Sequence, residues 1–180
     1  PETREVELNF GGFSVTMPHK QTIMQHLDII DPTAAKIGAV NTVKVGDEGK
    51  LIGYNTDAHG FITPLKAKYG DLRGARAAVV GAGGAARACV YALKEEGAEV
   101  ELFVRDVAKA WAFADESEIP LDLISNFDPS ANTDILVDTT PLGMSGSFEQ
   151  ETLFTADQLK GVKFVYDLVT KPYDTPIIRE

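Results

Sequence analysis

Apolar residues in the first third of the chain recur in short runs that favour extended segments and one helix. Residues 6–10 and 13–16 alternate like strands on either side of a glycine pair. A helix is predicted next, because apolar residues recur there at helical spacing, at Ile23, Met24, Leu27 and Ile30. We expect this helix to end near Pro32, since the residue before a proline disfavours helical geometry.

Two more strands and a second helix are predicted before residue 76. Residues 37–45 and 50–54 alternate like paired strands joined by the turn signal GDEG. The helix after them is capped by Thr56 or Asp57 and closes at Gly70. The segment GDLRGAR that follows is favoured as a joint between two parts of the chain.

From residue 77 onward the pattern changes to short apolar runs separated by helical segments. The run at 77–80 suits a strand buried on both faces, and the helix after it, 84–96, stops at Gly97. Further strands are predicted at 100–104, 134–137 and 164–169. Strands that alternate with helices favour an α/β fold with a parallel sheet and right-handed crossovers.

Composition restricts the classes of function. Hydrophobic residues make up 44% of the 180 residues and the mean hydropathy is -0.07, values typical of a soluble globular protein. The chain lacks both a signal-peptide pattern and the roughly 20-residue apolar run that spans a bilayer. Its one cysteine, Cys89, indicates a reducing, cytoplasmic compartment. A net charge of -10 without a basic cluster disfavours nucleic-acid binding. The histidines and the cysteine show no metal-ligand spacing, so no metal site is expected.

The segment Gly81-Ala82-Gly83-Gly84-Ala85-Ala86 fits the dinucleotide-binding fingerprint G-x-G-x-x-G/A between a strand and a helix. Its first glycine permits the tight turn, and its second lets a pyrophosphate approach the backbone. The phosphates would then lie at the helix N-terminus, where free N–H groups favour anions. A turn that only packs a strand on a helix is the alternative. In this context we favour a Rossmann-like dinucleotide-binding domain.

The end of the second strand of that domain bears on the choice of cofactor. Arg105 and Lys109 stand one helical turn apart, and both can reach one phosphate, which favours NADP. Asp106 between them could instead accept hydrogen bonds from the ribose hydroxyls of NAD. A solvated surface of charged side chains explains this stretch equally well.

Five blocks, in this order, resemble the shikimate dehydrogenase family: SVTMPHK, IGAVNT, GYNTDAHG, VVGAGGAARA and DTTPLGM. The resemblance covers essentially the whole chain. It implies an enzyme that reversibly reduces 3-dehydroshikimate to shikimate with NADPH in aromatic amino-acid biosynthesis. It also implies two lobes: a partial α/β substrate-binding and catalytic lobe over 1–57, and a Rossmann-like NADP-binding domain with a linker helix over 58–180.

The resemblance also implies roles for individual residues. Lys20 and Asp57 match the catalytic pair. The substrate-binding positions are Ser14, Thr16 and Asn41. The positions that contact the cofactor are Gly81, Ala82, Gly83, Gly84, Ala85, Arg105, Lys109, Thr140 and Leu142.

The chemistry of alcohol oxidation gives Lys20 a role of its own. Oxidising a secondary alcohol sends a hydride to the nicotinamide and a proton to a base. A lysine serves as that base where burial or nearby cations favour its neutral form. A carboxylate opposes this, so Asp57 is expected to orient Lys20 and bind a substrate hydroxyl. Taken alone, Lys20 reads as a surface lysine and Asp57 as a helix cap.

This sequence departs from the pattern of the family at several places. Ser14 and Asp138 stand where the family usually has Asn, and Thr170 stands where Tyr is common. The terminal blocks of the family, with its substrate-carboxylate anchor, are not matched. These ends predict a fragment or the ordered part of a longer chain, and a larger multifunctional protein is one expected setting. An NAD-preferring quinate/shikimate dehydrogenase and a non-catalytic sensing domain are the alternatives.

Overall fold

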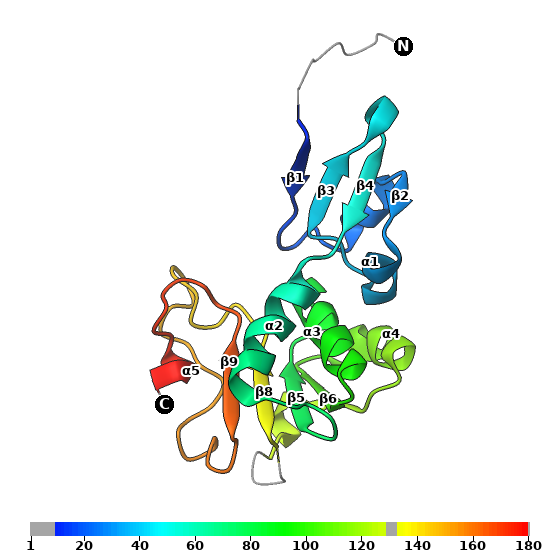
Figure 1. The fold of residues 1–180 in the computed structure, drawn as a ribbon. Helices are drawn as coiled ribbons and strands as arrows, with labels where there is room; N and C mark the ends of the chain where they lie inside the picture. The colour runs from blue at the N-terminus through cyan, green and yellow to red at the C-terminus, as the bar shows by residue number, and fades with distance from the viewer. Residues whose placement is uncertain (1–9, 129–132, 180) are drawn as a thin grey trace. The chain divides into compact units, whose positions relative to one another are not determined.

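The computed structural model describes residues 10–128 and 133–179, so most of the extended run expected at 6–10 lies outside the described residues. The chain forms two compact units, Pro1–Thr56 and Asp57–Glu180 (Figure 1). The segment GDLRGAR, predicted as a joint, instead lies inside the second unit, because strand β5 begins at its last residue, Arg76.

The described part of the first unit is built on a four-stranded sheet in the order β1-β3-β4-β2. Strand β2 is parallel to β4, and the other pairs are antiparallel. Its elements are β1 (Gly12–Ser14), the 3-10 helix η1 (Thr22–His26), β2 (Ile29–Ile30), α1 (Pro32–Ile37), β3 (Thr42–Val45), the 3-10 turn η2 (Asp47–Gly49) and β4 (Leu51–Tyr54).

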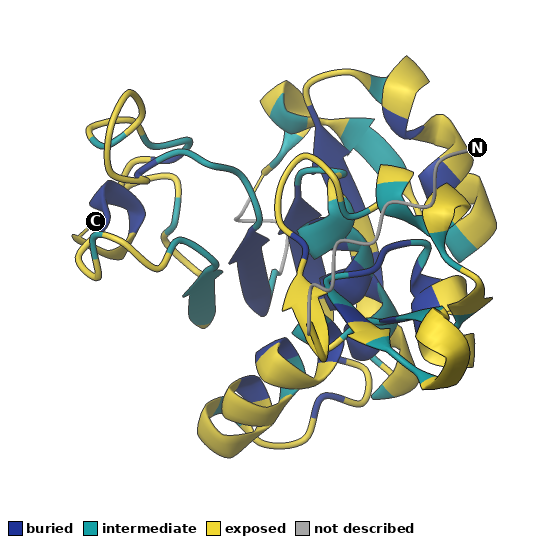
Figure 2. Ribbon diagram, turned by 90° about the horizontal axis from the view of Figure 1, so that it is seen from above, coloured by how far each residue is buried: buried dark blue, intermediate teal, exposed yellow. Residues whose placement is uncertain are grey.

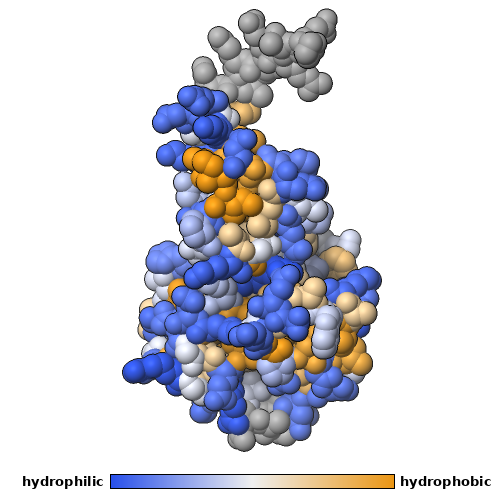
Figure 3. Space-filling view, turned by 90° about the vertical axis from the view of Figure 1, so that its right-hand side faces the viewer, coloured by the Kyte–Doolittle hydropathy of each residue, from blue (hydrophilic) through white to orange (hydrophobic). Residues whose placement is uncertain are grey.

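The first unit has a small apolar core. Its buried members are Val15, Ala34, Val40 and Val43. Phe10, Phe13 and Ile29 remain exposed in the same unit, and Figure 3 shows apolar atoms at its surface among hydrophilic ones. The sheet therefore buries only part of its apolar surface within the described residues.

The helix predicted over residues 23–30 is wrong. Its first part is the 3-10 helix η1, and Ile29 and Ile30 form strand β2 beside β4. The Asp28 carboxylate and backbone fix this pairing, since Oδ2 accepts from Leu51 N at 2.8 Å and Asp28 N donates to Leu51 O at 3.0 Å. Pairing with the sheet thus outweighs helical periodicity here.

Pro32 begins a helix instead of ending one. Proline is favoured at the first helical position, where its missing N–H costs no hydrogen bond. Asp31 caps this helix, α1, by accepting from the backbone N–H groups of Thr33 and Ala34 at 2.9 and 3.3 Å. The strand expected over 37–45 is consequently shorter, because Ile37 ends α1 and Gly38 reverses the chain at φ 69°.

The described part of the second unit is built on a parallel five-stranded sheet in the order β7-β6-β5-β8-β9, which confirms the predicted α/β class. Its elements are α2 (Asp57–Tyr69), β5 (Arg76–Val80), α3 (Gly84–Glu95), β6 (Glu99–Val104), α4 (Val107–Ser117), β7 (Leu121–Leu123), the 3-10 turn η3 (Ile124–Asn126), β8 (Ile135–Asp138), β9 (Phe164–Asp167) and α5 (Pro176–Arg179). Strand β7 was not predicted, because three residues give too short an alternation to recognise.

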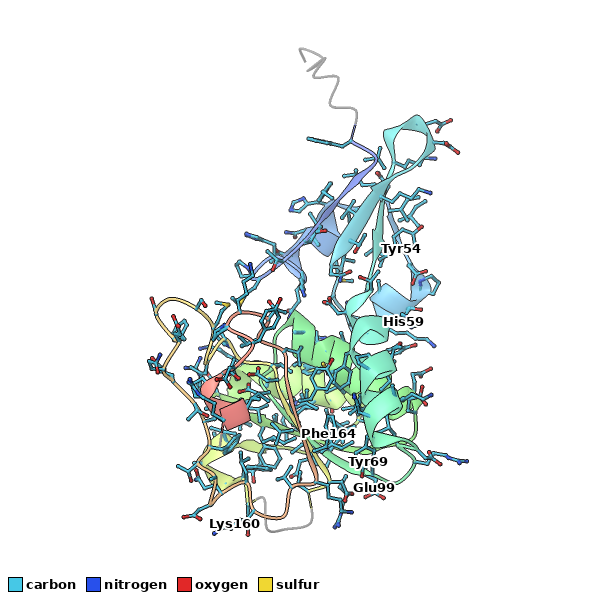
Figure 4. All side chains as sticks on the ribbon, turned by 60° about the vertical axis from the view of Figure 1, so that its left-hand side comes forward. Tyr54, His59, Tyr69, Glu99, Lys160 and Phe164 are labelled. Carbon is cyan, nitrogen blue, oxygen red and sulfur yellow. The ribbon has the colours of Figure 1, made fainter. Side chains whose placement is uncertain are left out.

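Both faces of the second sheet are covered. On one face α2 packs on β9, where Tyr69 lies edge-on to Phe164 with ring centroids 6.2 Å apart (Figure 4). The other face, with Val80, Phe103 and Leu136, packs against Phe154 and Ile177. Buried strands between exposed helix surfaces are visible in Figure 2. The one cysteine of the chain, Cys89, is a buried thiol in α3.

No helix in the described ranges combines the length and the apolar character needed to cross a bilayer.

Candidate functional site

The predicted substrate-binding residues of the first unit converge on one short segment. Two backbone hydrogen bonds bracket residues 16–20: Val15 N donates to Asn41 O, and Val40 N donates to Lys20 O, each at 2.7 Å. Between them the chain turns tightly, with His19 N donating to Thr16 O at 2.8 Å. The fold therefore holds Thr16 and Lys20 against the start of β3.

Asn41 joins the start of β3 to the end of the first unit. Its Oδ1 accepts from Thr56 N at 2.9 Å, and its Nδ2 donates to Thr56 Oγ1 at 2.9 Å. Thr42 Oγ1 also donates to Oδ1 at 2.9 Å. Part of the hydrogen-bonding capacity of this amide is thus used inside the protein. Ser14 is the register partner of Thr42, which places it beside the same group.

The predicted catalytic pair comes from both units. Lys20 follows the tight turn of the first unit, whereas Asp57 is the first residue of α2 in the second. Asp57 has the position of a first-turn acid, where a carboxylate interacts favourably with the helix dipole. Their proposed partnership therefore stays a prediction.

The glycine turn has the geometry that the fingerprint predicts. Strand β5 ends at Val80 and helix α3 starts at Gly84, with Gly81 at φ 105° between them. Gly83 is the N-cap residue and offers no side chain to the free N–H groups of the first turn. A β-carbon built on Gly83 would meet nothing within 4 Å. The helix N-terminus is thus open to an anion such as a pyrophosphate.

The loop after β8 contributes a residue that the sequence did not single out. Thr139 Oγ1 donates to Val80 O at 2.6 Å. A β-carbon built on Gly81 would stand 2.5 Å from Thr139 Oγ1. Thr139 therefore packs directly against the turn. Thr140 and Leu142 follow it and are linked by a hydrogen bond from Leu142 N to Thr140 Oγ1 at 3.3 Å. The sequence signal that could have identified Thr139 is the pair of threonines directly after a buried strand.

Arg105 and Lys109 are brought to the same edge of the sheet. Gly81 N donates to Phe103 O at 2.9 Å, which ties the turn to the end of β6, two residues before Arg105. Lys109 is engaged by Asp106, with Nζ and Oδ2 2.9 Å apart. Asp106 also caps α4 and accepts from Lys109 N at 3.2 Å. Hydrogen bonds from Lys109 hold the pKa of Asp106 below its ordinary value.

A buried carboxyl group stands at the same edge. Asp138, the last residue of β8, is only 1% exposed, and burial raises its pKa to about 6. Its Oδ1 accepts from Thr140 N at 2.8 Å, which opposes the rise. The adjacent strand places Asp167 beside it, and the negative charge of Asp167 raises the pKa further.

The described residues hold no cluster of three or more His, Cys, Asp or Glu side chains that could bind a metal ion. In the second unit, the carboxyl ends of β6, β5 and β8 thus gather a glycine turn with an uncapped helix N-terminus, two basic side chains and a buried carboxyl group. Ligands of open parallel sheets bind at this edge. The arrangement can hold an anionic nucleotide.

The comparisons with known proteins agree across sequence and structure. A family model described as the shikimate dehydrogenase substrate binding domain matches residues 2–43. The shikimate dehydrogenase (NADP(+)) of Bacillus cereus strain G9842 is 41% identical, in an alignment that covers 96% of this chain and 64% of that protein. The enzyme of the same name from Methanothermobacter thermautotrophicus is 39% identical, with 96% and 63% covered. The chain thus spans slightly less than two thirds of the length of these relatives.

Solved structures show the same likeness. The shikimate 5-dehydrogenase of Thermus thermophilus, in complex with NADP(H) and shikimate, has a TM-score of 0.83 at 37% identity, covering 97% of this chain and 64% of that one. The quinate dehydrogenase of Corynebacterium glutamicum, in complex with NAD, has a TM-score of 0.83 at 29% identity, covering 96% and 64%. Over nearly its whole length, therefore, the chain is similar to members of the shikimate dehydrogenase family.

Proposed function

We propose that the chain carries the activity of an NADP-dependent shikimate dehydrogenase, the reversible reduction of 3-dehydroshikimate to shikimate. The observation that carries this proposal is the open glycine turn at Gly83, on an α/β unit whose relatives bear the name shikimate dehydrogenase (NADP(+)). The first unit then supplies the substrate-binding lobe, and the second unit binds the nucleotide.

The nucleotide fits the residues present. The β-carbon position of Gly83 faces open space, and the first turn of α3 lacks a side-chain cap, so both can accept a pyrophosphate. Gly81, Ala82, Gly84 and Ala85 complete the turn, and Thr140 and Leu142 are the proposed cofactor contacts from the loop after β8. When bound, NADP(H) supplies the hydride chemistry.

Arg105 and Lys109 are the proposed ligands of the 2′-phosphate. Arg105 offers a planar fork of donors for a phosphate, and Lys109 offers a point charge. Because Asp106 engages Lys109, we propose that Arg105 carries most of the preference for NADP. The name NADP(+) in the curated relatives supports this choice over an NAD-preferring quinate/shikimate dehydrogenase.

In the substrate lobe, Lys20 takes the proton of the substrate hydroxyl during oxidation and returns it during reduction. Asp57 orients Lys20 and binds a neighbouring hydroxyl. Ser14, Thr16 and Asn41 bind the remaining hydroxyl groups of the substrate. The tight backbone of residues 16–20 supports this role, because it fixes the start of the Lys20 side chain relative to Asn41.

We also propose that the protein works in the cytoplasm on a small-molecule substrate, without a nucleic-acid partner. A net charge of -10 and a single, buried cysteine support this proposal. The match to a chorismate mutase/shikimate 5-dehydrogenase fusion protein from Clostridium acetobutylicum, at 31% identity, supports a multifunctional setting as a further proposal.

The test is formation of reduced nucleotide by the purified chain, its mass confirmed, with shikimate or quinate and with NADP or NAD. We expect turnover with shikimate and NADP. Binding of NADP without turnover on either substrate would contradict the enzymatic proposal and favour a nucleotide-binding sensor. Faster turnover with quinate and NAD would contradict the proposed substrate and cofactor.

A further inference from the structure

Asp138 is a buried acid in a position that the proposed chemistry does not use. It ends β8, level with Val80 on β5 and Asp167 on β9. The residue after Val80 is Gly81, which opens the nucleotide-binding turn, and the residue after Asp138 is Thr139, which packs against Gly81. Parallel strands lie about 4.8 Å apart, so Asp138 stands one strand away from the residue that precedes the turn.

The neighbours of Asp138 leave its charge poorly compensated. Val80, on the β5 side, is apolar, and Leu136 on the same sheet face belongs to an apolar core with Ile177. On the β9 side stands Asp167, which is the charged group that acts on Asp138. The Asp167 carboxylate accepts from Val169 N at 2.9 Å and from the Thr175 hydroxyl. The Asp138 carboxyl group accepts from Thr140 N at 2.8 Å.

We propose that Asp138 sets the affinity of the second unit for an anionic dinucleotide, which binds less tightly when this carboxyl group is ionised. The inference rests on the proposed nucleotide-binding function. Ionisation adds a negative charge, shielded from solvent, behind a turn that receives phosphates. Two unit charges about 10 Å apart, at an effective dielectric constant of about 20, change an equilibrium constant roughly tenfold. Burial raises the pKa of Asp138 to about 6, so the change would fall in an accessible pH range.

A purely structural role for Asp138 predicts a different result. In that role the carboxyl group only holds Thr140 N–H and so shapes the loop. Asp138→Asn keeps an oxygen that can accept this hydrogen bond but removes the charge. The variant therefore separates the electrostatic effect from the structural one.

The experiment measures the dissociation constants of NADP for the wild-type chain and for Asp138→Asn between pH 5 and 8. The 2′-phosphate of the ligand titrates in the same range, with a pKa of about 6, so the ratio of the two constants is used because ligand ionisation cancels in it. We expect the dissociation constant of the wild-type chain, divided by that of Asp138→Asn, to be near one at pH 5 and to rise to about ten at pH 8. Glu101→Gln is the matched control, because it removes one carboxylate two residue positions nearer the amino end of the same sheet. Its ratio should stay flat.

A ratio that stays near one for Asp138→Asn would overturn this inference while leaving nucleotide binding intact. Weaker binding by the variant at every pH would also overturn it in favour of the structural role. Absence of binding at all pH values would contradict the proposed function itself. Should the variant not fold, calorimetry of NAD binding to the wild-type chain at pH 6, in two buffers of different ionisation enthalpy, tests the inference instead. We expect the complex to take up a fraction of a proton when NAD binds. Binding without proton uptake would refute the inference.

Discussion

Thr139 fills the space beneath Gly81, since a β-carbon on this glycine would stand 2.5 Å from the Thr139 hydroxyl oxygen. The same hydroxyl donates to Val80 O at 2.6 Å, so Thr139 packs the loop after β8 against the end of strand β5 and its turn. Gly81 also has a φ of 105°, which side chains other than glycine rarely adopt. The two requirements make Gly81 harder to replace than Gly83.

Gly81→Ala should therefore lower the free energy of unfolding by about 3 kcal/mol, through overpacking and backbone strain, and weaken nucleotide binding. Gly83→Ala is the matched control for folding, because its β-carbon would face open space. We expect Gly83→Ala to lower stability by about 1 kcal/mol or less, because alanine is a poorer N-cap residue than glycine, yet to weaken NADP binding at least roughly tenfold. Urea unfolding and calorimetry measure the two effects. Unchanged NADP affinity in Gly83→Ala would contradict a pyrophosphate at this turn.

Replacing Lys20 with Met should lower turnover by about 10²–10⁴-fold, the usual contribution of a positioned acid or base. Nucleotide affinity should be unchanged, because the glycine turn belongs to the other unit. Steady-state kinetics and equilibrium titration separate these two results. Lys36→Met, on an exposed position of α1, is the control and should retain activity. Full activity in the Lys20 variant would remove it from the mechanism.

Arg105→Ala should weaken NADP binding by roughly 10–100-fold, because charge-assisted hydrogen bonds to a phosphate are lost. Binding of NAD, which lacks the 2′-phosphate, should change little. Lys109→Ala should have a smaller effect, since Asp106 already engages this ammonium group. Competitive titration with both nucleotides provides the measurement. An equal loss for NAD and NADP would assign Arg105 a structural role.

The raised pKa of Asp138 has a consequence for stability. Because the folded pKa lies above the ordinary value of 3.8, the stabilisation from its protonated form is complete below 3.8 and is lost as the pH rises through about 6. Asp138→Asn should remove this loss. The variant should be more stable than the wild-type chain at pH 8, by up to about 3 kcal/mol, and no more stable near pH 4. Urea unfolding at both pH values tests this, and a gain independent of pH would contradict it.

Asp134 should show the opposite dependence. The backbone N–H of Arg76 and the Lys163 ammonium group hold its pKa below the ordinary value, with Asp134 oxygens 2.9 Å from Arg76 N and 2.7 Å from Lys163 Nζ. Its stabilisation is therefore present above pH 3.8 and lost as the pH falls through the folded pKa. Asp134→Asn should destabilise the chain by about 1–3 kcal/mol at pH 7 and by less in acid, as measured by urea unfolding.

The second unit was predictable in outline because its signals are local. Short apolar runs gave β5, β6, β8 and β9, and Gly97 marked the end of α3, where Gly97 has a φ of 79°. The glycine turn followed from spacing alone. Strand β7 was missed because only three residues pair with β6.

What the sequence could not show depends on contacts between distant residues. The helix expected at 23–30 fails because Asp28 pairs with Leu51, a partner 23 residues away. Thr139 was missed for the same reason, since the glycine that it supports lies 58 positions earlier and no local pattern connects them. The burial of Asp138 was likewise invisible, although its departure from the usual Asn marked the position.

The burial of Cys89 allows the opening of helix α3 to be measured by thiol labelling. Its thiol is the only one in the protein and is 1% exposed within α3, the helix that starts at the glycine turn. A thiol reagent can modify it only in molecules whose helix has opened, so the rate of labelling measures how often that opening occurs. A ligand that rests on the first turn of α3 should slow this reaction, which allows occupancy to be followed without any turnover.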